Sequence, residues 1–274
     1  MTEYKALDTE QSNEKSAHID EMTTMEMVRL INEEDKKVAL AVETALPEVA
    51  DAIDIIAERL KKGGKLFYVG AGTSGRLGIL DASECPPTYG TPYELVQGII
   101  AGGNQAAFRA VERAEDSTED TVNQMKERGF CEKDVCVGIS ASGSAPCVHS
   151  SLNFARSLGA ATVSVQCSST SPAIPLSDVA IVAPVGAEVI KGSTRMKAGT
   201  ATKLILNMIS TGVMVKLGRV KGNSMIYMRP TNQKLHDRAV RIIEEQSGKP
   251  YEMCEAALKS ADGSIEKAIE LLKQ

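Results

Sequence analysis

The sequence has no tryptophan, and phenylalanine and tyrosine together supply only 4% of its 274 residues. Proteins that bind single-stranded nucleic acids stack the bases on aromatic side chains, so this composition disfavours such a function. The 31 lysines and arginines are outnumbered by 36 aspartates and glutamates, which leaves a formal net charge of −5. Such a chain has little basic surface for phosphate contacts, and we expect no nucleic-acid partner.

Long apolar segments are also absent. No uncharged apolar run reaches the roughly 18 residues of a membrane-spanning helix. Residues 1–5 are mostly polar or charged, without the apolar segment of a secretory signal. We therefore expect a cytoplasmic protein that does not enter a membrane. The six cysteines form no Cys-x-x-Cys pair and only three histidines are present, which predicts reduced thiols in the core and no metal site.

Short apolar segments bounded by glycine alternate with longer segments of helical periodicity. The strand-like segments are residues 66–69, 94–100, 134–139, 162–166 and 179–182. Helical spacing is found over residues 20–32, after residue 35, and over residues 47–62, 105–114, 118–128 and 146–158. Alternation of this kind predicts an α/β fold, a doubly wound parallel sheet with helices on both faces.

The last third of the chain reads as helical. Residues 195–217 have the pattern of a long core helix, which Ser193 or Thr194 could cap. Further helical segments are residues 231–245, 251–260 and 264–273, with a break at residues 247–250. We expect a polar N-terminal arm (1–19), a main domain (20–247) and a short helical tail (248–274). The tail is too small to hold a core without help.

The segment Gly70-Ala71-Gly72-Thr73-Ser74-Gly75 follows the first predicted strand and matches G-x-G-x-x-G. A dinucleotide site would need an acidic residue at the end of the next strand, where residues 99–104 have none. The hydroxyl groups of Thr73 and Ser74, with backbone N–H groups at a helix N-terminus, instead suit a phosphate. The alternative is a tight turn that binds nothing.

A second hydroxyl-rich loop, Ser140-Ala141-Ser142-Gly143-Ser144-Ala145-Pro146, follows the third predicted strand. Loops at the carboxyl ends of parallel strands face one crevice. Neither loop contains the lysine that a Walker-type nucleotide loop requires. The two loops together favour a monophosphorylated small molecule such as a sugar phosphate, and the predicted binding residues are Gly72, Thr73, Ser74, Ser140, Ser142, Gly143 and Ser144.

Residues 70–88, GAGTSGRLGILDASECPPT, resemble the signature of the N-acetylmuramic acid 6-phosphate etherases. Residues 110–116 (AVERAED), 192–201 (GSTRMKAGTA) and 231–242 resemble the same family. The resemblance covers roughly residues 20–247. It implies membership of the sugar isomerase (SIS) superfamily, whose α/β domains bind phosphosugars.

The resemblance also implies an activity. The family cleaves the D-lactyl ether of N-acetylmuramic acid 6-phosphate, giving N-acetylglucosamine 6-phosphate and D-lactate. It acts in the cytoplasm during recycling of the cell wall, as a homodimer without a cofactor. The open-chain sugar permits removal of the C2 proton and elimination of lactate from C3, followed by addition of water. This chemistry needs a base and an acid.

By the family match, Glu84 is the acid for the leaving oxygen and Glu115 is the base, although these two roles could be exchanged. Glu84 precedes Cys85-Pro86-Pro87, where we expect the helix to break and the carboxylate to point into a crevice. The alternative for Glu84 is an ordinary surface position. Glu115 lies in an acidic group with Glu112 and Asp116, which without the family match would suggest a solvated charged face. Carboxylates that lie close together would also raise the pKa of one of them and help to keep an acid protonated.

Two basic residues open the predicted long helix. Arg195 and Lys197 could reach an anionic group of the substrate, such as the lactyl carboxylate, or form ordinary salt bridges. The histidines His149 and His236 have no partner pattern, and we interpret both as structural or surface residues.

The chain departs from the family pattern in the second loop. Etherases usually read Ala-Ala-Ser-Gly-Arg-Thr-Pro, whereas this chain has Ser144 and Ala145 in place of Arg and Thr. The loss of a guanidinium group removes a positive charge that serine does not replace. The altered loop resembles the glucokinase regulatory protein, which gives a second hypothesis, a non-catalytic phosphosugar sensor.

A third hypothesis, a sugar-phosphate isomerase, is disfavoured because the segment Glu84-Cys85-Pro86-Pro87 belongs to the etherase pattern. Residues 250–274 resemble the beginning of a small ubiquitin-associated-like helical module, shortened relative to the family.

Overall fold

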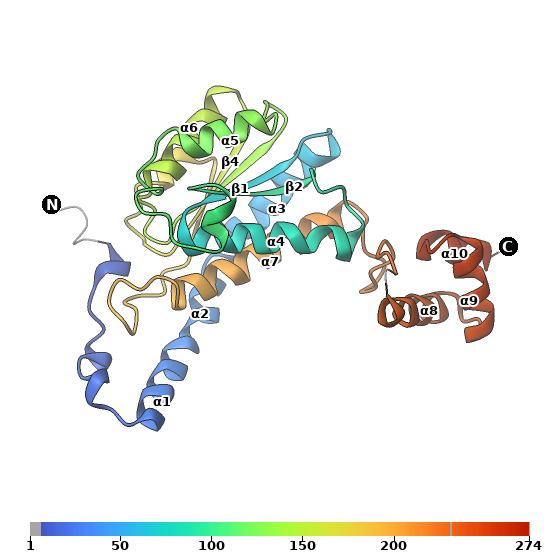
Figure 1. The fold of residues 1–274 in the computed structure, drawn as a ribbon, viewed down its shortest axis with the longest axis horizontal. Coiled ribbons are helices and arrows are strands. Elements are labelled where there is room, and N and C mark those ends of the chain that lie inside the picture. The colour runs from blue at the N-terminus through green and yellow to red at the C-terminus, as the bar shows by residue number, and fades with distance from the viewer. Residues whose placement is uncertain (1–6, 231, 274) are drawn as a thin grey trace.

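The computed structural model describes residues 7–230 and 232–273; residues 1–6 of the predicted arm, Thr231 and Gln274 lie outside the described residues. Its centre is a parallel sheet with the strand order β2-β1-β3-β4-β5 (Figure 1). The strands are β1 (Leu66–Gly70), β2 (Val96–Ile100), β3 (Val135–Ile139), β4 (Ala161–Gln166) and β5 (Val179–Val182). In the central register, Leu66 lies opposite both Val96 and Val135.

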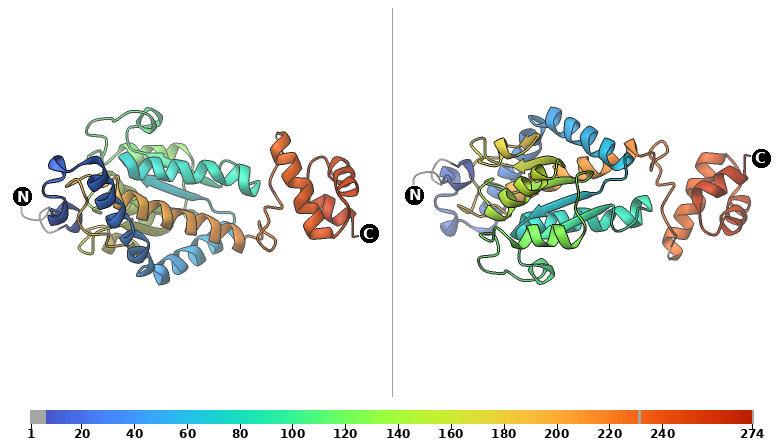
Figure 2. Two further views of the ribbon diagram at one scale, coloured as in Figure 1. Left: turned by 90° about the horizontal axis from the view of Figure 1, so that it is seen from below. Right: turned by 90° about the horizontal axis from the view of Figure 1, so that it is seen from above.

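Helices cover both faces of this sheet. The main domain contains α1 (Thr24–Asp35), α2 (Lys37–Glu43), α3 (Leu46–Lys61), α4 (Gly72–Tyr89), α5 (Asp120–Glu127), α6 (Pro146–Ser157) and α7 (Lys197–Lys216). Helices α5 and α6 lie on one face, and α3, α4 and α7 lie on the other (Figures 1 and 2). The prediction of a doubly wound parallel sheet is confirmed.

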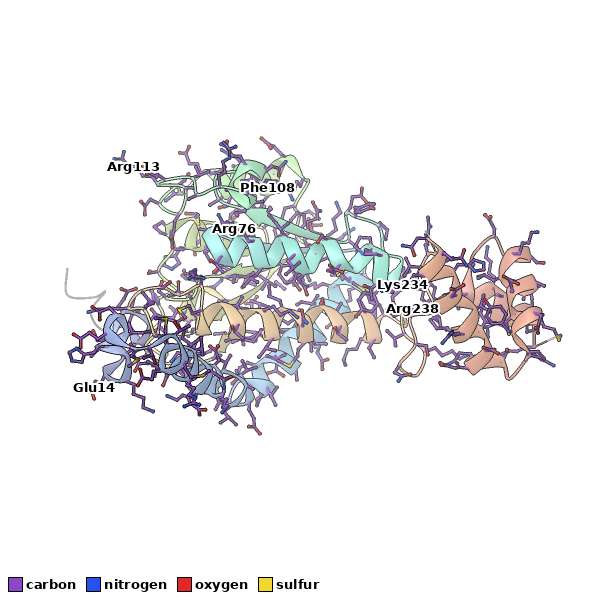
Figure 3. The ribbon with its side chains drawn as sticks, turned by 60° about the horizontal axis from the view of Figure 1, so that its bottom comes forward. Glu14, Arg76, Phe108, Arg113, Lys234 and Arg238 are labelled. Carbon is purple, nitrogen blue, oxygen red and sulfur yellow. The ribbon has the colours of Figure 1, made fainter. Side chains whose placement is uncertain are left out.

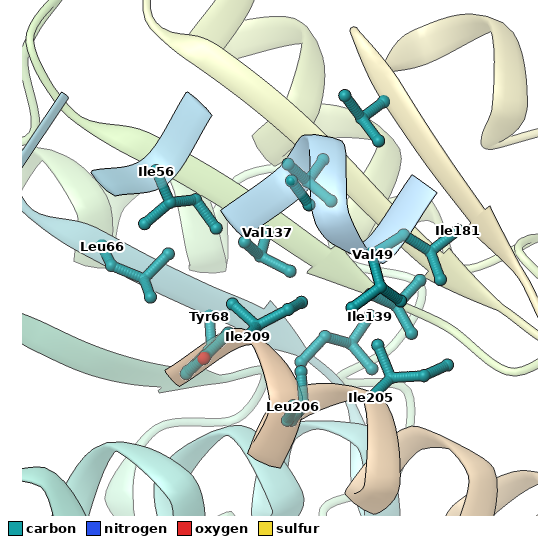
Figure 4. Close-up of a cluster of buried hydrophobic side chains, with 14 of the residues drawn as sticks. Val49, Ile56, Leu66, Tyr68, Val137, Ile139, Ile181, Ile205, Leu206 and Ile209 are labelled. Atoms are coloured by element: carbon teal, nitrogen blue, oxygen red, sulfur yellow. The ribbon is translucent and has the colours of Figure 1, made fainter. Parts of the chain in front are cut away.

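The core explains why the strands could be recognised. Every residue of β1 and β3 is buried, as expected when helices cover both faces of a parallel sheet. Figure 4 shows one side of this core, where Ile56 of α3 and Ile209 of α7 belong to the same cluster as Leu66 and Ile139 of the sheet. Among residues 7–230 and 232–273, none of the helices combines the length and apolarity that crossing a membrane requires.

Before α1, the chain forms short 3-10 turns and lies against the carboxyl end of the sheet. We call residues 7–16 the N-terminal strap. The side chain of Asp8 accepts hydrogen bonds from the backbone N–H of Ser169 (3.0 Å) and from its hydroxyl group (2.8 Å). The Asn13 amide donates to the carbonyl of Ala187 over 3.4 Å. The strap is therefore fixed to two loops that follow β4 and β5.

Two local predictions are wrong. Helix α4 does not break at Pro86 and Pro87 but continues to Tyr89, and Gly90 ends it with a φ of +62°. The prolines are close to the helix end, so they remove few backbone hydrogen bonds, and packing against α7 holds this last turn, where the Tyr89 hydroxyl donates to Thr211 over 3.3 Å.

The second error concerns residues 105–114, where a helix was predicted. Only Asn104–Ala107 form a 3-10 turn, and the rest is loop. Phe108 is 89% exposed, and Figure 3 shows it with Arg113 at the outside of the molecule. A short helix is not stable in water without an apolar surface to pack on, and Arg113 has a φ of +60° that no helix could contain.

The C-terminal helices α8 (Gln233–Ser247), α9 (Tyr251–Ser260) and α10 (Ile265–Leu271) form a separate lobe (Figures 1 and 2). All three pack on one apolar cluster that includes Val240, Ile243, Leu258 and Ile269. Lys234 and Arg238, from the stretch that resembles the etherases, are exposed on α8 (Figure 3).

The shared cluster bears on the predicted domain boundary. Because α8 contributes to the same core as α9 and α10, the tail does not begin at residue 248 as a structural unit. We propose that the boundary lies in the connection at residues 218–230, before α8. The apolar face of α8 would then complete the core that α9 and α10 alone are too small to form.

Candidate active site

A cavity of about 420 Å³ opens at the carboxyl edge of the sheet. Its walls come from the loop after β1, the loop after β3, the loop that carries Glu115, the start of α7 and the N-terminal strap. The hydroxyl-bearing residues that line it are Thr73, Ser74, Ser140, Ser142, Ser144, Thr194 and Thr202. The structure thus brings the two predicted hydroxyl-rich loops together around one space.

The loop after β1 is shaped by its glycines. Gly72 lines the cavity with a φ of +50°, a conformation that side-chain-bearing residues rarely adopt. A Cβ atom on Gly75 would lie 2.6 Å from Cγ1 of Ile100, so only glycine permits this approach to β2. No side chain caps the first turn of α4. Its backbone N–H groups therefore remain available to an anion beside Thr73 and Ser74.

The loop after β3 holds its hydroxyl groups by internal hydrogen bonds. The backbone N–H of Gly143 donates to the Ser140 hydroxyl (3.1 Å), and the Ser142 and Ser144 hydroxyl oxygens lie 2.7 Å apart. Gly143 itself does not line the cavity. With a φ of +74° it lies against Ser171, where a Cβ atom would come within 1.7 Å of Oγ, so its part is to shape the loop.

His149 supports the same loop from behind. One ring nitrogen, Nε2, lies 2.6 Å from the carbonyl oxygen of Gly143, and the ring is outside the cavity lining. His236 is on α8, in the C-terminal lobe. Both positions agree with the interpretation of these histidines as structural or surface residues.

Glu115 lines the cavity, together with Asp116. The N–H of Cys147 donates to the Glu115 carbonyl oxygen over 3.1 Å, which ties this loop to the first turn of α6. Glu115 is exposed at the mouth of the cavity, but the protein atoms around its carboxyl group remove part of its solvent and so raise its pKa. The neighbouring carboxylate of Asp116 raises this pKa further. A carboxyl group with a raised pKa is suited to exchange protons near neutral pH.

The structure does not bring Glu84 into this cavity. Because α4 continues through the prolines, Glu84 lies eleven residues beyond Thr73 along one helix, a rise of about 16 Å. It is exposed and lines a second, smaller groove of about 340 Å³ between α4 and α7. The two predicted catalytic carboxylates therefore occupy different cavities of the same chain.

Asp81 lies one helical turn before Glu84 and lines the same groove. Its Oδ1 accepts a hydrogen bond of 3.0 Å from the hydroxyl of Ser210, and its side chain is 9% exposed. Burial raises the pKa of Asp81 to about 6, against the effect of the Ser210 hydrogen bond. No sequence pattern singles out Asp81, because its burial depends on how α4 packs against α7.

Lys197 does not reach the cavity. Its ammonium group forms a buried ion pair with Glu34 of α1, at 2.9 Å, so the alternative of a salt bridge is the one observed. The start of α7 is capped by neither Ser193 nor Thr194. Instead the buried Glu188 carboxylate accepts from the backbone N–H groups of Lys197 (3.0 Å) and Ala198 (2.9 Å). Arg195 is exposed and also lies outside the cavity lining.

Sequence reasoning missed Glu10, which lines the cavity from the N-terminal strap. Its carboxylate lies next to the turn before α7, since a Cβ atom on Gly192 would be 3.7 Å from Oε2 of Glu10. No local pattern could have indicated this contact, because the strap and the turn are far apart in the sequence.

The charge of the lining is unusual for a site that should bind an anion. The described lining residues include Glu10, Glu115 and Asp116 but no lysine, arginine or histidine. An anion in this cavity would be held by hydroxyl groups and by the N-terminal N–H groups of α4. The first turn of α6 offers none, because Pro146 lacks an N–H and those of Cys147 and Val148 already donate to carbonyl oxygens. In the part of the chain that the structure describes, no cluster of three or more His, Cys, Asp or Glu could hold a metal ion.

Comparisons with known proteins show what the whole chain is similar to. A family model described as the glucokinase regulatory protein N-terminal SIS domain matches residues 48–156. The N-acetylmuramic acid 6-phosphate etherase of Clostridium beijerinckii is 54% identical over 265 residues, which cover 97% of this chain and 87% of that protein. The protein of the same name from Symbiobacterium thermophilum is 54% identical over 267 residues, which cover 97% and 89%.

Solved structures are similar in fold at low sequence identity. A phosphoheptose isomerase from Francisella tularensis is 19% identical, with a TM-score of 0.54 over 70% of this chain and 98% of that chain. This similarity concerns the fold alone, that is, the parallel sheet and its helices.

Proposed function

The chain belongs to the N-acetylmuramic acid 6-phosphate etherase family, and we propose that its reaction takes place in the cavity at the carboxyl edge of the sheet. The protein is a carbon–oxygen lyase that cleaves the D-lactyl ether of N-acetylmuramic acid 6-phosphate, giving N-acetylglucosamine 6-phosphate and D-lactate. The observation that carries the site assignment is Glu115, a carboxyl group of raised pKa among seven hydroxyl-bearing residues.

The phosphate group binds at the two hydroxyl-rich loops. Thr73 and Ser74 at the start of α4, with Ser142 and Ser144 before α6, offer hydroxyl groups and backbone N–H groups to its oxygens. Ser140 orients this second loop through Gly143. The absence of a cation among the described lining residues supports binding by hydrogen bonds and by the N-terminus of α4 rather than by ion pairs.

Glu115 is the base. In the open-chain sugar, the C1 aldehyde acidifies the proton on C2, and the Glu115 carboxylate removes it. The electron pair forms a double bond between C2 and C3 while the C3–oxygen bond breaks and an acid protonates the departing lactate. Water then adds to C3 and gives its proton to the carboxylate that had protonated lactate, while Glu115 returns its proton to C2. The net reaction is hydrolysis of the ether, and both carboxyl groups are restored. Glu115 can carry out both proton transfers at C2, the removal of the proton and its return.

Glu84 is the acid, supplied by a second copy of the chain. Within one chain, a carboxyl group about 16 Å along α4 from Thr73 cannot protonate the C3 oxygen of a sugar whose phosphate lies at that residue. In a homodimer related by a two-fold axis, residue i of one copy contacts residue j of the other and residue j of the first contacts residue i of the second. Glu84 of each copy can therefore lie at the cavity of its partner. The exposed groove that contains Glu84 is available for such a contact, and the homodimer is part of the proposal.

Mixing two inactive variants tests this assignment. Glu84→Gln and Glu115→Gln should each lose D-lactate release while remaining folded. If each site combines Glu115 of one copy with Glu84 of the other, unfolding and refolding the two variants together should restore about a quarter of the wild-type activity, because half of the dimers carry one complete site. No recovery from mixed dimers would contradict the shared site, and activity in either single variant would contradict that residue's role.

The alternative of a non-catalytic phosphosugar sensor is not favoured, because the etherase relatives match nearly the whole chain. The same assay separates the two: a sensor would bind N-acetylglucosamine 6-phosphate without releasing D-lactate from the muramic acid substrate. We further propose that the enzyme works in the cytoplasm on sugar phosphates recovered from the cell wall, and that it needs no cofactor.

A further inference from the structure

The cavity contains a carboxylate that the reaction above does not use. Glu10 lines the space together with Glu115 and the phosphate-binding hydroxyl groups, although it belongs to the N-terminal strap and not to the sheet domain. Its Oε2 lies beside Gly192, whose φ of +74° exposes the backbone of the turn before α7 at this point. A side-chain carboxylate in this position needs an explanation in an anion-binding cavity.

The strap holds Glu10 in place through its neighbours. Leu7 and Thr9, which flank Asp8, are buried against the main domain. Asp8 itself is fixed by the two hydrogen bonds from Ser169. Glu10 therefore extends from an anchored backbone, and its place in the cavity wall is a built feature of the tertiary structure.

Glu10 and Glu115 line the cavity from different parts of the fold. The turn at Gly192 leads into α7, which lies on the face of the sheet that α3 and α4 also cover. Glu115 is tied to the first turn of α6 on the other face. A sugar whose phosphate occupies the serine and threonine loops would lie between the two carboxylates.

We propose that Glu10 binds the substrate directly, accepting hydrogen bonds from sugar hydroxyl groups and so positioning C2 against Glu115. A carboxylate accepts hydrogen bonds strongly. It also repels the phosphate and the lactyl carboxylate, which leaves one favourable orientation for a substrate with anionic groups. This inference rests on the proposed function, since it takes the same site and substrate class.

The test compares Glu10→Gln and Glu10→Ala with Glu14→Gln. Glu14 is in the same strap but is exposed and outside the cavity lining (Figure 3). Glu14→Gln therefore removes the same charge from the strap without removing a carboxylate from the cavity. We expect both Glu10 variants to raise KM for N-acetylmuramic acid 6-phosphate and Kd for N-acetylglucosamine 6-phosphate, by about tenfold in Glu10→Ala. The inhibition constant of inorganic phosphate should not increase, because inorganic phosphate has no sugar hydroxyl group to donate to Glu10 and loses only its repulsion by that carboxylate.

Two outcomes would overturn the proposal. The first is wild-type KM and product affinity in both Glu10 variants. The second is an equal loss of affinity for inorganic phosphate, which would mean that Glu10 only shapes the cavity. Failure of the proposed function would be a different result, namely no D-lactate release from the wild-type protein. In that case the affinity for N-acetylglucosamine 6-phosphate would still test the role of Glu10 in binding.

Discussion

Nζ of Lys197 lies 2.9 Å from Oε2 of Glu34, and each side chain is only 2% exposed. The pair joins α1 to the first turn of α7, whose neighbouring residues Ala198 and Gly199 line the cavity. Lys197 therefore acts on the substrate only indirectly, by holding the cavity wall. Glu34 also accepts a hydrogen bond from Lys37, so the carboxylate is shared by two ammonium groups.

Glu34→Gln should destabilise the protein. The change leaves Lys197 charged and buried without a counter-charge, which costs about 3–5 kcal/mol in comparable pairs. Urea denaturation monitored by circular dichroism measures the free energy of unfolding. Lys197→Met is the matched variant, and it should cost less, because Glu34 keeps Lys37 as a partner. Equal and small losses in both variants would show that the pair contributes little.

The same pair gives a pH dependence. Although burial opposes it, the hydrogen bonds from Lys37 and Lys197 lower the pKa of Glu34 from 4.5 to about 2. Because the folded-state pKa is the lower one, the stabilisation is complete above pH 4.5 and is lost as the pH falls toward 2. The difference in unfolding free energy between the wild type and Glu34→Gln should shrink over this range; a constant difference would contradict the ion pair.

Asp116→Asn should shift the pH dependence of catalysis. The Asp116 carboxylate raises the pKa of Glu115, so its removal lowers that pKa and the base becomes available at lower pH. The acidic limb of the kcat/KM profile for D-lactate release should therefore move to lower pH. Glu112→Gln, an exposed carboxylate outside the cavity lining, is the control. An unmoved limb in Asp116→Asn would mean that another group controls it.

Ser144→Arg restores the residue type usual in the etherase loop. Ser144 lines the cavity without a cation beside it, so a guanidinium group there should strengthen substrate binding and lower KM roughly three- to tenfold at low salt. The gain should diminish as salt increases. Ser260→Arg in the C-terminal lobe adds the same charge away from the cavity and should leave KM unchanged. An unchanged or higher KM in Ser144→Arg would show that this loop binds the phosphate in another way.

Asp81→Asn should change the stability profile between pH 4 and 6. Burial raises the folded-state pKa of Asp81 from 3.8 to about 6. As the pH rises through this window, the unfolded chain releases the proton first, so wild-type stability falls, by an amount on the order of 2–3 kcal/mol. The asparagine does not titrate, and the variant should gain stability relative to the wild type until about pH 6. Parallel profiles, measured by thermal unfolding, would refute a raised pKa.

Several features of the fold could be predicted because their causes are local. Strands β1, β3, β4 and β5 were recognised to within about one residue, since a sheet covered on both faces favours short, mostly apolar segments. The loops at Gly72 and Ser142 follow from the same logic, because residues after parallel strands meet at one edge. Glu115 was reached through the family resemblance, and the structure places it in the cavity.

The sequence by itself thus determined the α/β class, the two hydroxyl-rich loops and the kind of ligand they suit, because each depends on the periodicity and turn chemistry of neighbouring residues. Only the tertiary structure decided that α4 continues past Pro87, that Glu84 lies outside the cavity and that Lys197 is buried with Glu34. It alone brought Glu10 into the site. These results depend on contacts between segments far apart in the chain, whose energies no local pattern records.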